Sequence, residues 1–499
     1  MTLTDPPAAV PGGAPLPGTI PLAHGVSHAF LAHHRICPCG LLDDGSVAVA
    51  VEPNSRLSGL DDLAVAYGRP VVTRPHTLEA LQILIARTVG GGGRESAARQ
   101  EPAEGALVSD IRDLANQPPV VRYVNLLLRE GYEANASDVH LESTLGGLRA
   151  RFRIDGVLVP ALPPPALLDA AVISRVKLLA DLDIAERRRP QDGRILMRLE
   201  ERDIDIRVST VPSTLGESVV LRLLDGGRRE VALAELGLPA PLLGDVDRLA
   251  RRPHGMILVT GPTGSGKTTT LYAALRLRDA GREKIITVED PVEYAVDGIT
   301  QVAVQRQAGV TFASVLRSIL RQDPDVLMVG EMRDAETAEL AVQAALTGHV
   351  VFSTLHTNDA VGAIPRLIDL GVPPYLVAAT LDAVLSQRLV RRTCDRCREP
   401  YAPEVIPAEM EVSPGTVFRR GKGCAHCRHT GYRGRVGLFE LLLLTGEMRN
   451  AIAAGVPAGR LEELAGPGGR ATLRQDGWAK AAAGVTTIEE VLRVTQSGS

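Results

Sequence analysis

The residues best suited to chemistry lie mid-chain, in the stretch GPTGSGKT (261–268). Its spacing fits GxxxxGK[ST], a loop whose backbone N–H groups close around phosphate oxygens, and it has the required strand-like run before it and helical pattern after it. Lys267 is expected to reach the outer phosphates and Thr268 to bind Mg²⁺. An unrelated glycine-rich turn is the alternative. The predicted nucleotide-binding residues are Gly261, Pro262, Thr263, Gly264, Ser265, Gly266, Lys267, Thr268 and Thr269.

Carboxylates and a histidine follow three further apolar runs. Glu331 follows the apolar run in DVLMVGEMRD, and His356 lies just past the strand-like run in GHVVFSTLHTNDA. Three carboxylates, Glu289, Asp290 and Glu293, lie at the end of ITVEDPVEY. A strand that delivers a carboxylate beside a phosphate loop suits water activation or an outer contact to Mg²⁺. Solvated acids and a structural histidine are the alternatives. No segment resembles the base-specificity motif of GTPases, which favours ATP.

Four cysteines form two CxxC pairs, CDRC and CAHC, separated by 26 residues. Two such pairs bring four thiolates into a tetrahedron, which suits a closed structural Zn²⁺ site. An iron–sulfur or rubredoxin-like iron site uses the same ligands and stays open as an alternative. CPC (37–39) has no second pair, and its cysteines are expected to be ordinary thiols. The predicted metal ligands are Cys394, Cys397, Cys424 and Cys427.

Composition shifts along the chain divide it into the elements that must position these residues. The stretch GGGGRESAARQEPAEG reads as a flexible linker, and the dipeptide Asp155-Gly156 as a hairpin turn. The expected divisions are a disordered tail (1–20), a small α/β module (21–89), a linker (90–105), a second α/β module (106–225), a linker (226–234), the nucleotide domain (235–389), a cysteine-bearing segment (390–435) and a helical C-terminal region (436–499).

The bulk composition excludes several classes of protein. The 499 residues predict roughly three or four domains. A formal net charge of −4 and 3% aromatic residues do not favour a nucleic-acid-binding protein. No apolar run is long enough for a transmembrane helix, and the N-terminal residues do not resemble a secretory signal. We therefore expect a soluble, multidomain, cytoplasmic protein.

With these segments in hand, the chain from about residue 118 onward resembles the type II secretion ATPases, the general secretion pathway protein E family. This family belongs to the larger superfamily of secretion and type IV pilus ATPases. The motifs that carry the resemblance beyond the phosphate loop and the cysteine pairs are ASDVHLE (136–142), RFRIDG (151–156), RRPQDGRI (188–195), DIRVST (205–210), TVEDPVEY (287–294), the long run from 316 to 360 and GYRGRVGLFELL (431–442).

The resemblance implies a RecA-like P-loop core, a PAS-like second N-terminal domain, a small N-terminal adaptor domain and a zinc-binding subdomain. It also assigns catalytic roles. Glu293 falls at the glutamate that polarises the attacking water, Glu331 at the Walker B glutamate, and His356 in the histidine box that senses the γ-phosphate. Arginines of the second module match positions that reach the phosphates as the domains close. The candidates are Arg153 first, then Arg207 and Arg222.

The resemblance further implies a homohexamer in which ATP binds between the second N-terminal domain and the C-terminal domain. ATP hydrolysis would drive the rotation of these two domains relative to each other. The adaptor domain would bind a membrane-anchored partner. The ring would act on an inner-membrane platform protein that assembles a pseudopilus, so the protein would be peripheral at the inner membrane. No convincing cyclic-dinucleotide motif is present. A type IV pilus assembly ATPase is the main alternative, and a nucleic-acid translocase and a non-catalytic scaffold are further ones.

Overall fold

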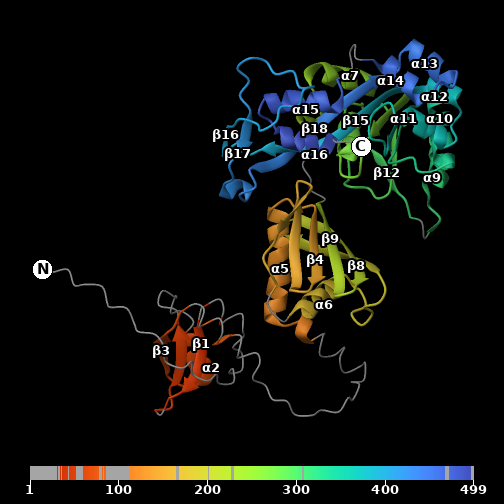
Figure 1. Cartoon of the computed structure of the whole chain (residues 1–499). Helices are drawn as coiled ribbons and strands as arrows, with labels where there is room; N and C mark the ends of the chain where they lie inside the picture. Colours follow the sequence, from red (N-terminus) through yellow and green to blue (C-terminus); the bar gives the residue numbers. More distant parts are fainter. Residues whose placement is uncertain are drawn as a thin grey trace.

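The computed structural model describes residues 31, 34, 36–42, 44–51, 60–77, 81, 84–85, 113–164, 168–199, 202–225, 230–305, 308–466 and 471–495. The predicted tail (1–20) and the predicted linker (90–105) lie outside these residues. The described residues form three α/β units, coloured red, orange to yellow, and green to blue in Figure 1. We call them the first unit (31–85), the second unit (113–225) and the third unit (230–495).

The first unit is built on a three-stranded sheet in the order β1-β2-β3. Strand β2 is buried along its whole length, because it pairs antiparallel with β1 and parallel with β3 in the centre of the sheet. Cys37 and Cys39 are free buried thiols, as expected, and burial raises the pKa of Cys37 to about 12. The elements whose bounds fall within the described residues are β1 (Ile36–Leu41), β2 (Val47–Val51), α2 (Leu60–Tyr67) and β3 (Val71–Pro75).

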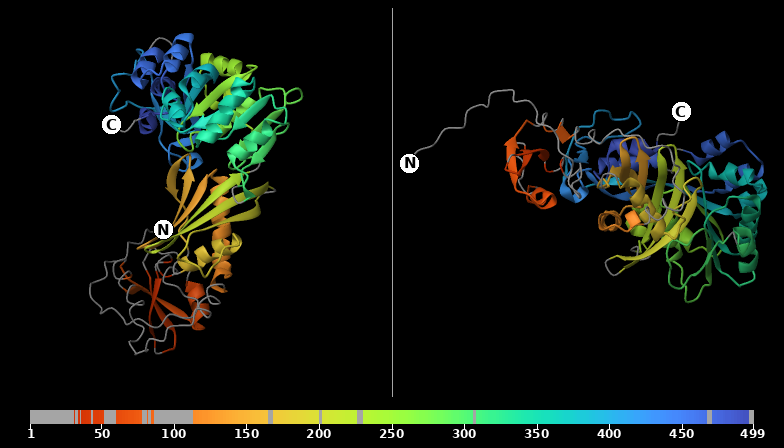
Figure 2. Two further views of the ribbon diagram at one scale, coloured as in Figure 1. Left: turned by 90° about the vertical axis from the view of Figure 1, so that its right-hand side faces the viewer. Right: turned by 90° about the horizontal axis from the view of Figure 1, so that it is seen from below.

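The second unit is a six-stranded antiparallel sheet in the order β6-β5-β4-β9-β8-β7, with both helices on the same face (Figure 2). Alternate apolar residues of the strands pack against these helices, as a half-buried sheet requires. The turn at Asp155-Gly156 is confirmed, since it joins β5 to β6 with positive φ at both residues. The elements are α5 (Pro118–Glu133), β4 (Asp138–Thr144), β5 (Gly147–Ile154), β6 (Val157–Pro160), α6 (Asp169–Leu179), β7 (Gln191–Leu199), β8 (Arg202–Ser213) and β9 (Gly216–Asp225).

The third unit contains a seven-stranded sheet in the order β12-β11-β13-β14-β10-β15-β18. All neighbours are parallel except β15 and β18, which are antiparallel. The strands are β10 (Gly255–Thr260), β11 (Ile285–Glu289), β12 (Thr300–Ala303), β13 (Val326–Val329), β14 (Val350–Leu355), β15 (Leu381–Thr393) and β18 (Tyr432–Leu443).

Helices cover both faces of this sheet, so its central strands β10, β13 and β14 are buried along their whole length and are mostly apolar. Met256 and Leu258 of β10 belong to a core shared with helices α9 to α12 and with two helices near the C-terminus, α13 (Gly446–Ala453) and α14 (Ala458–Ala465). Ile257 and Val259 point the other way, toward α7 and α8. The helices of the sheet domain are α7 (Ala240–Ala250), α8 (Lys267–Leu275), α9 (Phe312–Ile319), α10 (Ala335–Leu346), α11 (Ala363–Asp369) and α12 (Pro374–Thr380).

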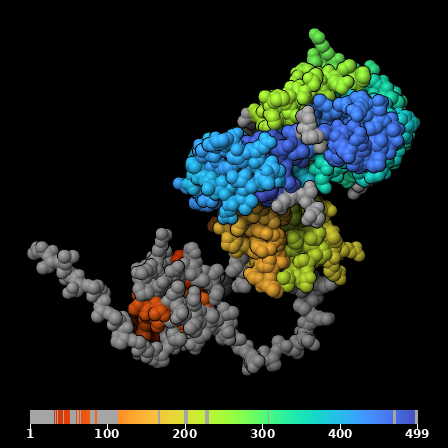
Figure 3. Space-filling model, turned by 45° about the horizontal axis from the view of Figure 1, so that its top comes forward, coloured from red at the N-terminus to blue at the C-terminus, as the bar shows by residue number. Residues whose placement is uncertain are grey.

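The cysteine segment is inserted between β15 and β18, the two antiparallel strands at one edge of the sheet. It forms a light-blue lobe in Figure 3 and contains the short strands β16 (Arg398–Pro400) and β17 (Arg419–Gly421). The prediction of a helical region from residue 436 is wrong for its first residues, because the apolar run VGLFELLL is buried as part of β18. The helices that follow are α13 (Gly446–Ala453), α14 (Ala458–Ala465), α15 (Leu473–Ala482) and α16 (Ile488–Thr495).

Contacts between the second and third units involve the end of the cysteine segment. Asp155, at the β5–β6 turn, accepts a hydrogen bond from the Gly434 N–H at 2.8 Å and lies 3.5 Å from Arg435. Arg428 donates to Glu130 of α5 at 3.2 Å. Among the described residues, no helix combines the length and the apolar character needed to cross a membrane.

Candidate functional site

The predicted chemical groups of the third unit meet at one edge of its sheet. The phosphate loop follows β10, Glu331 follows β13, His356 follows β14, and the segment containing Glu293 follows β11. These four strands run parallel, so their carboxyl ends lie at the same edge. Crevices outside the carboxyl ends of parallel strands are where ligands bind in open α/β sheets.

The phosphate loop turns tightly between β10 and α8, and its glycines are required by close packing or by a positive φ. A Cβ on Gly261 would lie 2.3 Å from the Gln387 carbonyl oxygen, and Gly266 adopts a φ of +87° just before α8 begins. Lys267 is buried at the first position of α8, and its Nζ donates to the carbonyls of Gly261 and Pro262. Burial lowers the pKa of Lys267 to about 8, and the charge of nearby Glu331 opposes this shift.

The loop fits a phosphate group on two observations. Pro262, Thr263 and Gly264 are exposed, so their backbone faces solvent at the N-terminus of α8, where a helix favours anions. The buried Ser265 Oγ has no hydrogen-bond partner among the described residues. Thr268 is half-buried in the first turn of α8. The loop therefore offers backbone N–H groups, an ammonium and hydroxyls to a polyphosphate.

Two polar pairs behind the loop were missed by sequence reasoning. Thr270 of α8 donates to the buried Gln387 of β15 at 2.7 Å, which ties the loop helix to the sheet. The Thr260 and Thr357 hydroxyls lie 2.7 Å apart and join the start of the loop to the residue after His356. The available signal was a polar residue inside or directly after an apolar strand, as in ILVT and VLSQRL.

Glu331 and His356 are brought together across β13 and β14. The Nε2 of half-exposed His356 lies 3.3 Å from Glu331 Oε2, and Arg333 donates to Glu331 Oε1 at 2.6 Å. Glu331 thus faces a histidine, an arginine and, at longer range, the Lys267 ammonium. The Arg333 contact was not predicted, although the residue lies only two positions beyond Glu331.

The half-buried Glu293 lies in the loop after β11, beside the buried Glu289. Burial raises the pKa of Glu289, hydrogen bonds from Thr287, Tyr272 and Gln301 lower it in part, and the nearby charge of Glu293 raises it again. The two carboxylates therefore differ in environment. Glu289 is enclosed by donors, and Glu293 is the one with access to solvent at the sheet edge.

The structure brings the three candidate arginines together in one row across the second unit. Residues paired directly across neighbouring strands point to the same face of a sheet. The row lies on the face opposite α5 and α6, because the residues that alternate with its members form the core. Its members in strand order are Arg153, Asp138, Arg222, Arg207 and Arg194.

Asp138 lies between two of these arginines, with Arg222 Nε at 3.0 Å and Arg153 Nε at 3.9 Å from its carboxylate oxygens. Arg153 also donates to the Gly156 carbonyl at 3.1 Å. Within the described parts of the second and third units, no hydrogen bond or ion pair connects Arg153, Arg207 or Arg222 to the phosphate loop. The arginines are thus grouped with one another and not with the loop in this chain.

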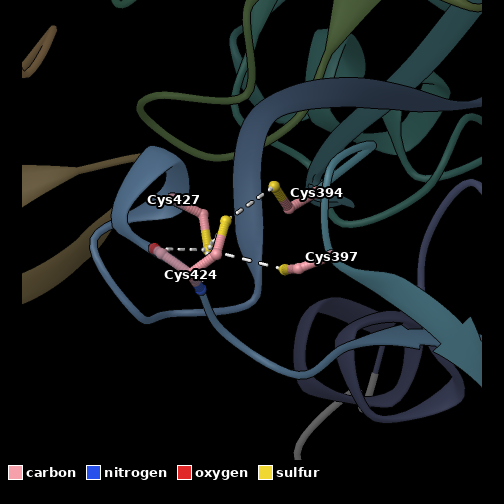
Figure 4. A group of neighbouring side chains, drawn as sticks. All are labelled: Cys394, Cys397, Cys424 and Cys427. Atoms are coloured by element: carbon pink, nitrogen blue, oxygen red, sulfur yellow. Dashed lines mark hydrogen bonds between the residues drawn. The ribbon is translucent and has the colours of Figure 1, made fainter.

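The four cysteines of the third unit converge from two loops (Figure 4). Their sulfurs lie 3.7 Å apart for Cys424 and Cys427, 3.8 Å for Cys397 and Cys427, and 3.9 Å for Cys394 and Cys424. The Cys427 sulfur also accepts hydrogen bonds from the N–H groups of Cys424 and Gly431, which favours a thiolate. This geometry is compatible with one tetrahedrally bound metal ion.

Comparison with known proteins places these features in a family. A family model described as "Type II/IV secretion system protein" matches residues 113–493. The chain is 44% identical over 492 residues to "Type II secretion system protein E" of Xanthomonas campestris pv. campestris, covering 96% of this chain and 86% of that protein. It is 52% identical over 388 residues to the protein of the same name from Klebsiella pneumoniae, covering 78% of each. It is 47% identical over 393 residues to "Type II secretion system ATPase E" of Vibrio cholerae, covering 78% of this chain and 77% of that protein.

The fold of this chain is also similar to that of proteins with solved structures. The pilus retraction motor PilT with bound ADP matches with a TM-score of 0.50 and 28% identity, covering 74% of this chain and 96% of that one. The ATPase DotB of Legionella pneumophila matches with a TM-score of 0.54 and 21% identity, covering 74% and 95%, and supports the fold alone. The predicted multidomain α/β fold with a RecA-like P-loop core is confirmed. The chain belongs to the Type II/IV secretion system protein family, as the resemblance of its motifs predicted.

Proposed function

We propose that this protein is the ATPase of a type II secretion system, which hydrolyses ATP to drive pseudopilus assembly and protein export. One observation carries the proposal beyond the family match: the phosphate loop, the Glu331–His356 pair and the Glu293 segment share a single edge of one sheet. Hydrolysis needs a phosphate cradle, a carboxylate for the attacking water and a group that responds to the γ-phosphate. This edge carries a candidate for each of the three, which supports the proposal.

The proposed roles follow from position and chemistry. Lys267 would leave the carbonyls of Gly261 and Pro262 for the β- and γ-phosphates, to which its charge is complementary. Bound Mg²⁺, held through Thr268, would neutralise phosphate charge. Glu293, the solvent-accessible carboxylate, would orient and polarise the attacking water. Glu331 would act next to the metal, and His356 would register the γ-phosphate through its contact with Glu331.

The arginine row of the second unit would complete the site. Charge spreads over the phosphoryl oxygens in the transition state, and an arginine stabilises it there. Arg153, Arg207 and Arg222 lie on a sheet face that carries neither helix of the second unit, so this face is open to a nucleotide bound on a third unit. The phosphates would then draw Arg153 or Arg222 away from Asp138. Rotation of the second unit against the third would follow ATP binding and hydrolysis.

We further propose that the chain acts as a homohexamer and is held at the inner membrane by partner proteins. The adaptor domain would bind a membrane-anchored protein, and the ring would act on the inner-membrane platform protein. The cysteine cluster would hold one structural Zn²⁺, since four thiolates with no water position suit a closed site.

Replacing Lys267 by alanine tests this function. The purified Lys267→Ala protein should lose ATP hydrolysis, whereas Lys284→Ala, which removes an exposed lysine of the same unit, should keep it. In the source organism, Lys267→Ala should selectively remove folded, signal-peptide-bearing enzymes from the culture supernatant and leave surface pili intact. An unchanged supernatant with missing pili would instead assign the protein to type IV pilus assembly. Equal hydrolysis by Lys267→Ala and the unmutated protein would refute the nucleotide site.

A further inference from the structure

A buried polar cluster lies directly beneath the loop that carries Glu293. Its centre is Glu289, the last residue of β11, which is only 2% exposed. One carboxylate oxygen accepts hydrogen bonds from Thr287 at 2.6 Å and from Gln301 at 3.2 Å. The other accepts a short hydrogen bond from the hydroxyl of Tyr272. Glu289 is thus engaged by three donors and almost completely removed from solvent.

The donors of this cluster link it to both sides of the nucleotide site. Tyr272 belongs to α8, five residues after Lys267. The Gln301 side chain donates to the Tyr294 carbonyl at 3.1 Å and accepts from the Val296 N–H at 2.7 Å. The rings of Tyr272 and Tyr294 meet edge to face, with centroids 4.8 Å apart. The loop that contains Glu293 is therefore fastened on both sides to one buried carboxylate and to the phosphate-loop helix.

The direction of these contacts points to a role beyond packing. A buried carboxylate costs free energy unless it is fully hydrogen-bonded, and apolar residues of the same size are often as stable or more so. Here every contact of the carboxylate leads to α8 or to the strands and loop around Glu293. A catalytic carboxylate works only when its position relative to the phosphates is fixed, because even a displacement of about 1 Å lowers the reaction rate strongly.

We propose that Glu289, held by Tyr272 and Gln301, is a positioning residue that fixes Glu293 relative to the phosphate-loop helix. This inference rests on the proposed function, because it assigns Glu293 to the hydrolytic step. Glu289 itself touches neither the nucleotide nor the attacking water. Loss of its contacts would leave nucleotide binding intact and misplace the group that polarises water.

The first test measures amide hydrogen exchange in the full-length protein. Tyr272→Phe removes only the hydroxyl and keeps the ring on Tyr294, and Glu289→Ala removes the acceptor. Both should speed exchange across residues 290–296, where the Val296 N–H is protected by Gln301, and leave β13 and β14 unchanged. Tyr401→Phe is the matched control, because it removes a tyrosine–carboxylate hydrogen bond elsewhere in the third unit, from the cysteine segment to Glu489 of α16. Unchanged exchange at 290–296, or faster exchange throughout the third unit, would overturn the proposal.

The second test separates turnover from binding. Tyr272→Phe and Glu289→Ala should lower kcat by about 10- to 100-fold while the Kd for a fluorescent ADP analogue stays unchanged. Glu289→Gln should recover most of the turnover, because its amide still accepts from Thr287 and Gln301 and donates to the Tyr272 oxygen. The double variant Tyr272→Phe/Glu289→Ala should be no slower than the slower single variant, since both remove one shared contact.

The outcomes for this inference and for the proposed function are distinct. Hydrolysis that depends on Lys267 but is unaffected by Tyr272→Phe and Glu289→Ala would refute the positioning role and keep the ATPase. If ADP binding weakens by the same factor as turnover falls, the cluster contributes to nucleotide binding, and this result would also refute the positioning role. Hydrolysis that does not depend on Lys267 would refute the proposed function, and hydrogen exchange would then still decide whether Glu289 holds the loop.

Discussion

Replacing Cys394 by serine tests whether the four cysteines bind a metal ion, and the sulfur–sulfur distances in the structure allow the expected effect to be worked out. Four sulfurs about 2.3 Å from a central Zn²⁺ lie about 3.8 Å from one another in a tetrahedron. The sulfur–sulfur distances are 3.7, 3.8 and 3.9 Å for three of the cysteine pairs. These three distances match the spacing that the ion requires, and all four sulfurs lie within 4.8 Å of one another. A serine oxygen in place of one sulfur leaves an incomplete ligand set.

The expected loss is large but local. Structural Zn²⁺ contributes about 10–16 kcal/mol in small metal-binding domains, which equals or exceeds the stability of a typical whole domain. Between the cysteine pairs, β16 and β17 have three residues each, and the buried apolar side chains Met410 and Phe418 pack on α15 and α16. The segment from 394 to 431 should therefore unfold without metal, whereas the two large cores around the seven-stranded sheet should persist.

The assay combines metal analysis, limited proteolysis and nucleotide binding. The unmutated protein should carry one zinc per chain and resist cleavage between 394 and 431. Cys394→Ser should lose the metal, become cleavable there and still bind a fluorescent ADP analogue. Cys37→Ser is the control, because it removes a buried thiol in a different core and should leave the zinc in place. Iron, or no metal, in the unmutated protein, or full protection in Cys394→Ser, would refute the reasoning.

Two further predictions concern stability. In the second unit, Lys177 is fully buried and its ammonium donates to Glu217 at 2.8 Å, so Glu217→Ala strands a buried charge and should cost about 3–5 kcal/mol in denaturant unfolding. A loss under about 1 kcal/mol, the usual value of an exposed pair, would contradict this. In the third unit, burial raises the pKa of Glu490, but bonds from Arg493 and Arg391 outweigh it and lower the pKa to about 2. The folded-state pKa is depressed, so its stabilisation should be present above about pH 4.5 and be lost progressively toward pH 2. Thermal unfolding across this range should show the loss in the unmutated protein and a smaller one in Glu490→Gln.

Sequence reasoning worked best where the relevant contacts are local. The strand before Gly261 and the helix from Lys267 are short-range features, and the structure contains both as β10 and α8. The CxxC pairs also hold their thiols through local turns, so their convergence was predictable once two pairs were present. The error at residues 436–443 arose because the deciding contact is not local. A short apolar run can form either a buried helix or a strand, and which one forms depends on the segment that it packs or pairs with. Here the partner is β15, more than forty residues earlier.

The sequence by itself determined the chemical inventory: a phosphate loop, carboxylates and a histidine after apolar strands, and four paired thiols. Residue types and local spacing are enough to recognise these groups, because each motif consists of residues that lie close together in the sequence. Only the tertiary structure decided which of them meet. Strand order put Glu331 beside His356, antiparallel register put Arg153, Arg222 and Arg207 in one row, and packing of α8 on β11 enclosed Glu289 beneath Glu293. These are long-range pairings, set by how apolar faces pack and which strands become neighbours, and no short stretch of sequence specifies them.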